Sequence, residues 1–78
     1  MRLHRSPDLQ DQWYSLPTEV RAFIESLKKN PRPADAMTFE DEPDHFEEFI
    51  TGYWIGWLVD ESTGETIIRV TLSDPESL

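Results

Sequence analysis

The segment FEEFITGYWIGWLVD, residues 46–60, constrains the fold more than any other part of the chain. It contains two runs of aromatic and aliphatic residues, and Thr51 and Gly52 separate them. Glycine readily adopts the positive φ that a tight turn between two strands requires. The segment therefore predicts a β-hairpin whose turn lies at Thr51 and Gly52.

The second strand of this hairpin carries apolar side chains on both of its faces. Successive residues of a strand point to opposite faces. One face therefore carries Tyr53, Ile55, Trp57 and Val59, and the other carries Trp54, Gly56 and Leu58. We expect such a strand in the middle of a sheet, with helices over one face. After a turn at ESTGET, the β-branched run at residues 66–72 predicts a third strand that completes an antiparallel meander.

The first third of the chain predicts two helices. Ser6 followed by Pro7 is typical of a helix start, because serine caps the first turn and proline lacks an N–H that would have no partner there. Apolar residues then recur at helical spacing, with Leu9, Trp13 and Leu16 in the first helix and Val20, Phe23, Ile24 and Leu27 in the second. Asn30 and Pro31 end the second helix. The segment RLHRS, residues 2–6, predicts a short first strand.

These elements predict one α+β domain over residues 1–78, in which an N-terminal helical hairpin packs on an antiparallel β-meander. Between them lies the acidic connector ADAMTFEDEPDH, residues 34–45. Because the connector has no sustained periodicity, we expect a loop there with at most one short turn.

Charge is distributed unevenly along the chain. Residues 1–33 contain six Lys and Arg and four Asp and Glu, a net charge of +2, whereas residues 34–78 contain one Arg and twelve Asp and Glu, a net charge of −11. Nucleic-acid binding depends on Lys and Arg that neutralise phosphates. Direct nucleic-acid binding by the second half is therefore disfavoured. The absence of cysteine and of an apolar N-terminal run leads us to expect a cytoplasmic protein without a membrane anchor.

The order of motifs along the chain is similar to that of a known protein family. The motifs are a strand followed by Ser-Pro and a helix, Leu-Pro-x-Glu-Val at residues 16–20, Asn-Pro-Arg-Pro at residues 30–33, and TGYWIGWLVDESTGETIIRV at residues 51–70. Together they resemble the RelE/ParE superfamily of toxins from bacterial toxin–antitoxin pairs. The resemblance covers nearly the whole chain and implies the fold of that family. Its members cleave messenger RNA on the ribosome or act on DNA gyrase, in both cases without a metal.

The resemblance also implies that most catalytic side chains of the family are missing. The turn tyrosine falls on Tyr53, but the arginine after it falls on Trp54, and the strand tyrosine falls on Trp57. The Val-Gly-His-Arg and tyrosine near the family's C-terminus fall on Val70, Thr71, Leu72, Ser73 and Ser77. RNA cleavage needs an acid, a base and cations near the phosphate. Tyr53, the one catalytic candidate, cannot supply these alone, so we expect a degenerate active site without enzymatic activity or cofactor.

The segment FEDEPDHFEE, residues 39–48, is the main candidate for partner binding. The candidate residues are its carboxylates and one tryptophan that we expect on the outer face of the central strand: Glu40, Asp41, Glu42, Asp44, Glu47, Glu48 and Trp54. They fit a basic protein surface. A solvated loop would show the same composition. The spacing lacks the pattern of a calcium loop, so we expect no metal site. His4 and His45 lie in no recognisable catalytic or metal-ligand spacing.

The expected function is protein–protein binding by a toxin-like fold with a degenerate active site. One alternative is an active toxin, either a ribosome-dependent mRNA endonuclease or a gyrase inhibitor. A second alternative is an acidic mimic of nucleic acid that occupies a basic protein site. The sequence leaves the partner and the oligomeric state open.

Overall fold

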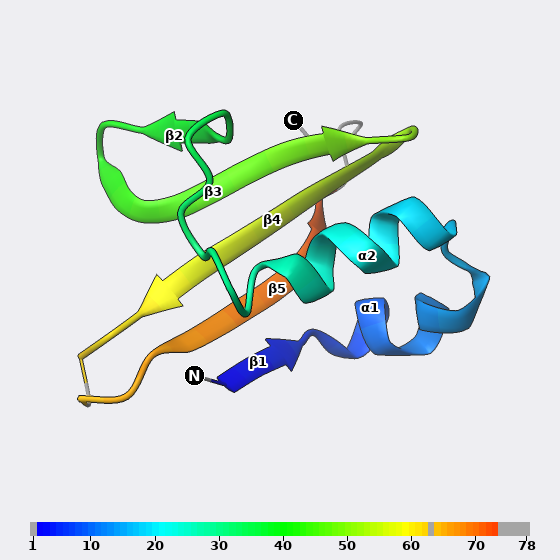
Figure 1. Ribbon diagram of the computed structural model, residues 1–78, viewed down its shortest axis with the longest axis horizontal. Helices are drawn as coiled ribbons and strands as arrows, with labels where there is room; N and C mark the ends of the chain where they lie inside the picture. The colour runs from blue at the N-terminus through cyan, green and yellow to red at the C-terminus, as the bar shows by residue number, and fades with distance from the viewer. Residues whose placement is uncertain (1, 63, 74–78) are drawn as a thin grey trace.

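Two short helices and a five-stranded sheet make up the computed structural model, which describes residues 2–62 and 64–73 (Figure 1). In chain order the elements are β1 (Arg2–Arg5), α1 (Pro7–Gln12), the 3₁₀ turn η1 (Trp13–Ser15), α2 (Thr18–Ser26), β2 (Met37–Phe39), β3 (Glu42–Ile50), β4 (Tyr53–Asp60) and β5 (Ile67–Ser73). The α+β class is confirmed. Within the described residues, no helix has the length and apolar character that crossing a membrane requires.

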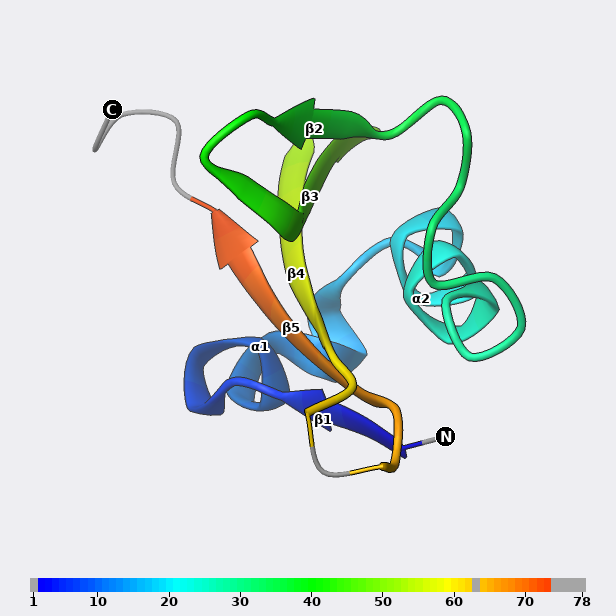
Figure 2. The same ribbon diagram turned by 90° about the vertical axis from the view of Figure 1, so that its left-hand side faces the viewer.

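The strands lie in the order β1-β5-β4-β3-β2. β3, β4 and β5 form the predicted antiparallel meander, with β4 in its middle. The predicted first strand is present as β1, and it pairs in parallel with β5, where Leu3 lies opposite Ile68. The sheet is therefore mixed. In Figure 2, α2 lies on one side of β3 and β4.

The expectation of a loop throughout residues 34–45 is wrong. Met37–Phe39 forms the edge strand β2, and β3 begins at Glu42. β2 pairs with β3 in antiparallel orientation, and the register shifts between Thr38 and Phe39. Alternation did not reveal this strand because an edge strand is defined by pairing with its neighbour, and exposed edges commonly carry charged residues. The acidic connector is thus largely part of the sheet.

The turn between β3 and β4 confirms the predicted hairpin. Thr51 has φ 48° and Gly52 has φ 88°, so both turn residues are in the left-handed region that two-residue hairpins favour. A positive φ is unusual for threonine. The Thr51 hydroxyl donates a 2.6 Å hydrogen bond to Glu19 Oε2 on α2, which ties the turn to the helix layer.

The first helix begins as predicted, whereas α2 ends at Ser26, before the predicted stop at Asn30 and Pro31. Ser6 Oγ accepts a 3.2 Å hydrogen bond from the backbone N–H of Leu9, and Pro7 is the first residue of α1. After α2, the N–H of Asn30 bonds to the carbonyl of Ser26 at 3.1 Å, so helical turns continue up to Pro31. The proline then stops them, because it has no N–H to donate.

One core joins the helices to the inner face of the sheet. Its buried residues are Leu9, Trp13, Leu16, Val20, Ile24 and Leu27 from the helical half and Phe46, Ile55, Trp57, Val59, Ile68 and Val70 from the sheet. Trp57 lies at its centre, with ring centroids 5.5 Å from Phe23 and 5.7 Å from Phe46. Phe23 itself is only partly buried, so it packs at the rim of the core.

Candidate functional site

The face of the sheet opposite this core is rich in apolar side chains, and we call it the open face. Register and alternation place three rows of residues across it: His45, Leu58 and Arg69; Glu47, Gly56 and Thr71; Phe49 and Trp54. Phe49 is 52% exposed, Leu58 is 46% exposed, and Met37 on β2 is 48% exposed. Sheet faces that meet water are normally polar. A cluster of exposed apolar side chains on one face is instead typical of an interaction site.

Several hollows lie on the open face within the described residues. One, of about 300 Å³, has Glu42 and His45 on one wall and Arg69 and Thr71 on the other. The second, also of about 300 Å³, lies between Met37, Phe39, Glu47 and Trp54. Both hollows are lined by apolar and charged residues together.

Gly56 contributes to the first hollow, because it has no side chain that could fill it. It lies in the central strand, between Glu47 of β3 and Thr71 of β5, and it lines the first hollow. A glycine in the interior of a strand weakens it and often marks a close approach by a ligand or another chain. None of the predicted site residues is Gly56. The signal was available, because Gly56 is the one small residue in a run of bulky ones.

A histidine with carboxylates on both ring nitrogens forms part of the wall of the first hollow. His45 Nδ1 lies 2.5 Å from Glu42 Oε2, and His45 Nε2 lies 3.3 Å from Glu47 Oε2. The ring stacks on Phe39, with 4.7 Å between the centroids. Two of the predicted partner-binding carboxylates are therefore held at defined positions by one imidazole.

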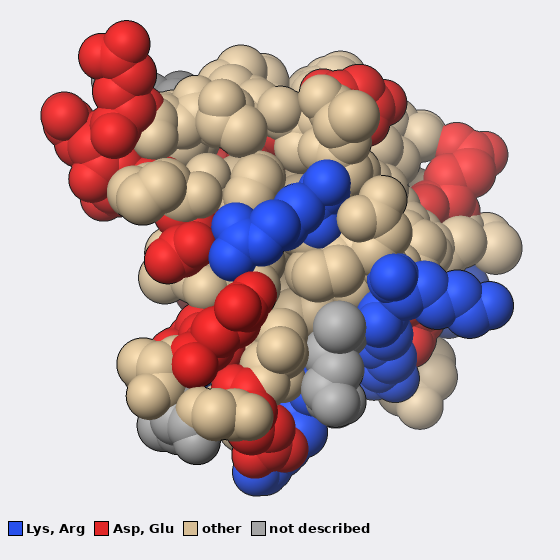
Figure 3. Space-filling view, turned by 60° about the vertical axis from the view of Figure 1, so that its left-hand side comes forward, with Lys and Arg blue, Asp and Glu red and all other residues tan. Residues whose placement is uncertain are grey.

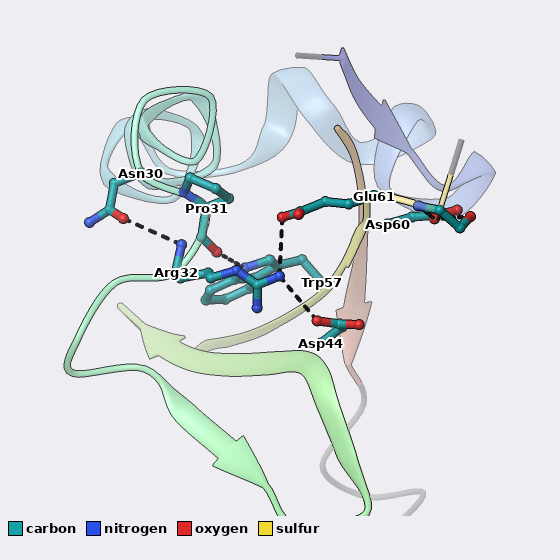
Figure 4. A network of polar contacts seen from close by, with 8 residues as sticks. Asn30, Pro31, Arg32, Asp44, Trp57, Asp60 and Glu61 are labelled. Carbon is teal, nitrogen blue, oxygen red and sulfur yellow. Dashed lines mark hydrogen bonds and ion pairs between the residues drawn. The ribbon is translucent and has the colours of Figure 1, made fainter. Parts of the chain in front are cut away.

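Asp44, another predicted partner-binding residue, belongs to a different network (Figure 4). Arg32 Nη2 donates hydrogen bonds to Asp44 Oδ1 at 3.0 Å and to Glu61 Oε1 at 3.2 Å. These hydrogen bonds raise the pKa of Arg32 above its ordinary value. The guanidinium also lies 5.7 Å from the ring centroid of Phe46. Asp44 thus pairs within the chain, on the side of the sheet that faces the core.

The remaining predicted partner-binding residues divide among three places. Glu40 and Asp41 are exposed in the turn between β2 and β3. Glu48 is half-buried on the core side, opposite Ile55, and burial followed by the charge of Asp35 raises its pKa. Trp54 lies on the open face as predicted, partly buried, with its ring centroid 5.2 Å from that of Phe49. In Figure 3, Asp and Glu side chains lie along the left margin and also at the upper right, whereas Lys and Arg lie in the middle and on the right.

Tyr53, the catalytic candidate, lies on the other face from Trp54 and packs against the core. Among the described residues its side chain makes no hydrogen bond. Of the other positions on the family pattern, Val70 is buried, Thr71 is exposed, and Ser77 lies outside the described residues. No group of three or more His, Cys, Asp and Glu side chains within residues 2–62 and 64–73 could hold a metal ion.

Comparisons with known proteins provide no relative for this chain. It matches no protein-family model, no curated protein and no solved structure.

Proposed function

We propose that this chain is a cytoplasmic, non-catalytic protein-binding domain related to the RelE/ParE toxins, and that the open face is its binding surface. The observation that carries the proposal is the exposure of Phe49, Leu58 and Met37 on a face that no described helix covers. Burying apolar area contributes about 25 cal/mol per Å². Aromatic residues such as Trp54 also dominate the energetics of many interfaces.

The position of Tyr53 supports the non-catalytic part of the proposal. Its side chain packs against the core, whereas the hollows lie on the opposite face. A general acid or base must come within hydrogen-bonding reach of the reacting atoms. A substrate in either hollow is on the far side of the sheet from Tyr53. The order strand, two helices and meander supports the proposed relationship to the toxins, together with the sequence motifs.

Site-specific photocrosslinking tests the binding face. Benzoylphenylalanine in place of Phe49 or Leu58 should form covalent adducts with a partner protein in bacterial cells. The matched control is the same substitution at Tyr14, which is 86% exposed in η1, between the two helices. Adducts at Phe49 and Leu58 but not at Tyr14 would support the open face. Adducts at Tyr14 alone, equal adducts at all three positions, or no adduct at any of them would contradict it.

A further inference from the structure

The charges around the open face are polarised across the sheet. Carboxylates lie at the β2–β3 edge, where Glu42 and Glu47 contact His45 and the neighbouring turn carries Glu40 and Asp41. Within the described residues, neither Glu40 nor Asp41 makes an ion pair. The negative charge at this edge is thus only partly balanced within the chain.

The cations at the opposite edge are paired internally. Arg69 on β5 lies 4.0 Å from Asp60, and Arg2 on β1 lies 3.8 Å from Glu65. These exposed pairs are weak, but each cation has a nearby opposite charge. The electrostatic potential over the open face is therefore negative toward β2 and β3 and closer to neutral toward β5.

The charge pattern selects among occupants of the open face. A second copy of the chain would bring another net charge of −9 to the same surface, and the two would repel. Nucleic acid would be repelled for the same reason. A protein segment with Lys or Arg next to apolar side chains complements the open face in charge and in polarity. Its cations match the acidic β2–β3 edge, and its apolar groups match the hollows.

We infer that the open face receives a basic amphipathic segment of a partner protein, with apolar side chains in the hollows beside Gly56 and a Lys or Arg against Glu42 and Glu47. This inference rests on the proposed function and specifies the chemistry of the partner. Gly56 provides the depth, because alternation directs a side chain at this position to the open face, where Gly56 lines the first hollow. The carboxylates provide direction, because the cation must lie at the β2–β3 edge.

Three synthetic peptides of equal length test this inference on the full chain labelled with ¹⁵N. The first is amphipathic and made of Leu and Lys, the second replaces its Lys by Glu, and the third replaces its Leu by Ser. The Leu/Lys peptide should bind at least about tenfold more tightly than either control, the scale of one strong interface contact. Its binding should shift the amide resonances of β3 and β4 but not those of α2.

Four variants separate the hollow from the charges. Gly56→Val fills the hollow without changing charge, and β-branched residues suit a strand. Thr71→Phe fills the same hollow from β5, so the test does not depend on one variant folding. Each should weaken binding of the Leu/Lys peptide by about tenfold. Glu42→Gln combined with Glu47→Gln should weaken binding and flatten its dependence on salt. The matched control, Asp11→Asn at an exposed position of α1, should bind as wild type does.

Equal binding of the Leu/Glu peptide or of the Ser/Lys peptide would overturn this inference. Wild-type affinity in both Gly56→Val and Thr71→Phe would also overturn it. Photocrosslinking distinguishes failure of the basic-segment inference from failure of the proposed function. Adducts at Phe49 and Leu58 with an acidic or uncharged partner segment would overturn the basic partner and leave the binding face in place.

Discussion

The indole Nε1–H of Trp57 donates a 2.9 Å hydrogen bond to the carbonyl oxygen of Pro31 (Figure 4). Trp57 lies at the centre of β4, and Pro31 follows the last helical turn after α2. The next residue, Arg32, pairs with Asp44 on β3 and with Glu61 beyond β4. The chain that leaves the helix layer is thus fastened to the sheet at two adjacent residues.

Replacing Trp57 should destabilise the fold strongly. Trp57→Ala removes a buried ring and should lower the free energy of unfolding by about 3 to 5 kcal/mol. Trp57→Phe keeps most of the ring but leaves the Pro31 carbonyl without its partner, and it should cost about 1 to 3 kcal/mol. Phe23→Ala should cost less than Trp57→Ala, because Phe23 is only partly buried. Urea unfolding measures the order of these losses. An unchanged free energy of unfolding in Trp57→Ala would contradict the central position of Trp57 in the core.

Replacing Arg32 should have a smaller and salt-dependent effect. Arg32→Ala removes two exposed ion pairs, and such pairs contribute about 0 to 1 kcal/mol each. The loss should be measurable at low ionic strength and should shrink at about 1 M salt, where the Debye length is about 3 Å. Urea unfolding at both ionic strengths measures it.

Two controls belong to the Arg32 measurement. Asp44→Asn should reproduce part of the loss, because it breaks one of the two ion pairs. Glu40→Gln combined with Asp41→Asn should leave stability within about 0.5 kcal/mol of wild type, since these are exposed turn residues. If Asp44→Asn changed the free energy of unfolding no more than the double turn variant does, the ion pair of Arg32 and Asp44 would contribute no stability.

Glu48→Gln should stabilise the protein at neutral pH. Burial and the charge of Asp35 raise the pKa of Glu48 in the folded state. The folded state then binds this proton more tightly than the unfolded state, so ionisation of Glu48 disfavours folding. The advantage of Glu48→Gln should be full above the folded pKa. It should decline as the pH falls toward the unfolded value of about 4.3.

Urea unfolding over this pH range measures the free energy of unfolding of Glu48→Gln and of wild type. The other carboxylates titrate in both proteins, so their contribution largely cancels in the difference between the two free energies. A variant that is less stable than wild type at neutral pH, or a difference that grows on acidification, would contradict the assigned direction.

Expression in a bacterial host should neither stop growth nor produce cleaved messenger RNA. The reason is that Tyr53 packs against the core and that Trp54 stands where the family pattern has an arginine. Growth curves and RNA integrity after induction measure this. Tyr53→Phe is the matched control and should behave like wild type. Growth arrest that Tyr53→Phe relieves would favour an active toxin over the non-catalytic domain.

The elements that could be predicted are those that local chemistry determines. The cap at Ser6 and the turn at Gly52 each follow from one residue's conformational or hydrogen-bonding preference. β2 could not be predicted, because its three residues form a strand only by pairing with β3. Glu47 and Glu48 lie in the predicted hairpin, where alternation already places adjacent side chains on opposite faces, so the two carboxylates could not belong to one binding surface.

The cluster at His45 was beyond sequence reasoning for a different reason. Glu42 and His45 are three positions apart, so regular alternation would place them on opposite faces of β3. The register of β2 against β3 shifts between Thr38 and Phe39, and Glu42 pairs opposite Phe39 within this irregularity. The irregular edge brings the carboxylate to the imidazole. A pattern read along one strand contains no information on such a shift in its neighbour.

The parallel pairing of β1 with β5 has a consequence for synthesis on the ribosome. Translation releases Leu3 early, but its partner Ile68 emerges only after β2, β3 and β4 have been made. The hairpin of β3 and β4 depends on contacts close in sequence and can form first. A nascent chain that lacks β5 has one side of β4 unpaired and β1 without a neighbour. Such intermediates expose apolar surface and unpaired strand edges, so this stage of synthesis is where chaperone binding or proteolysis would act.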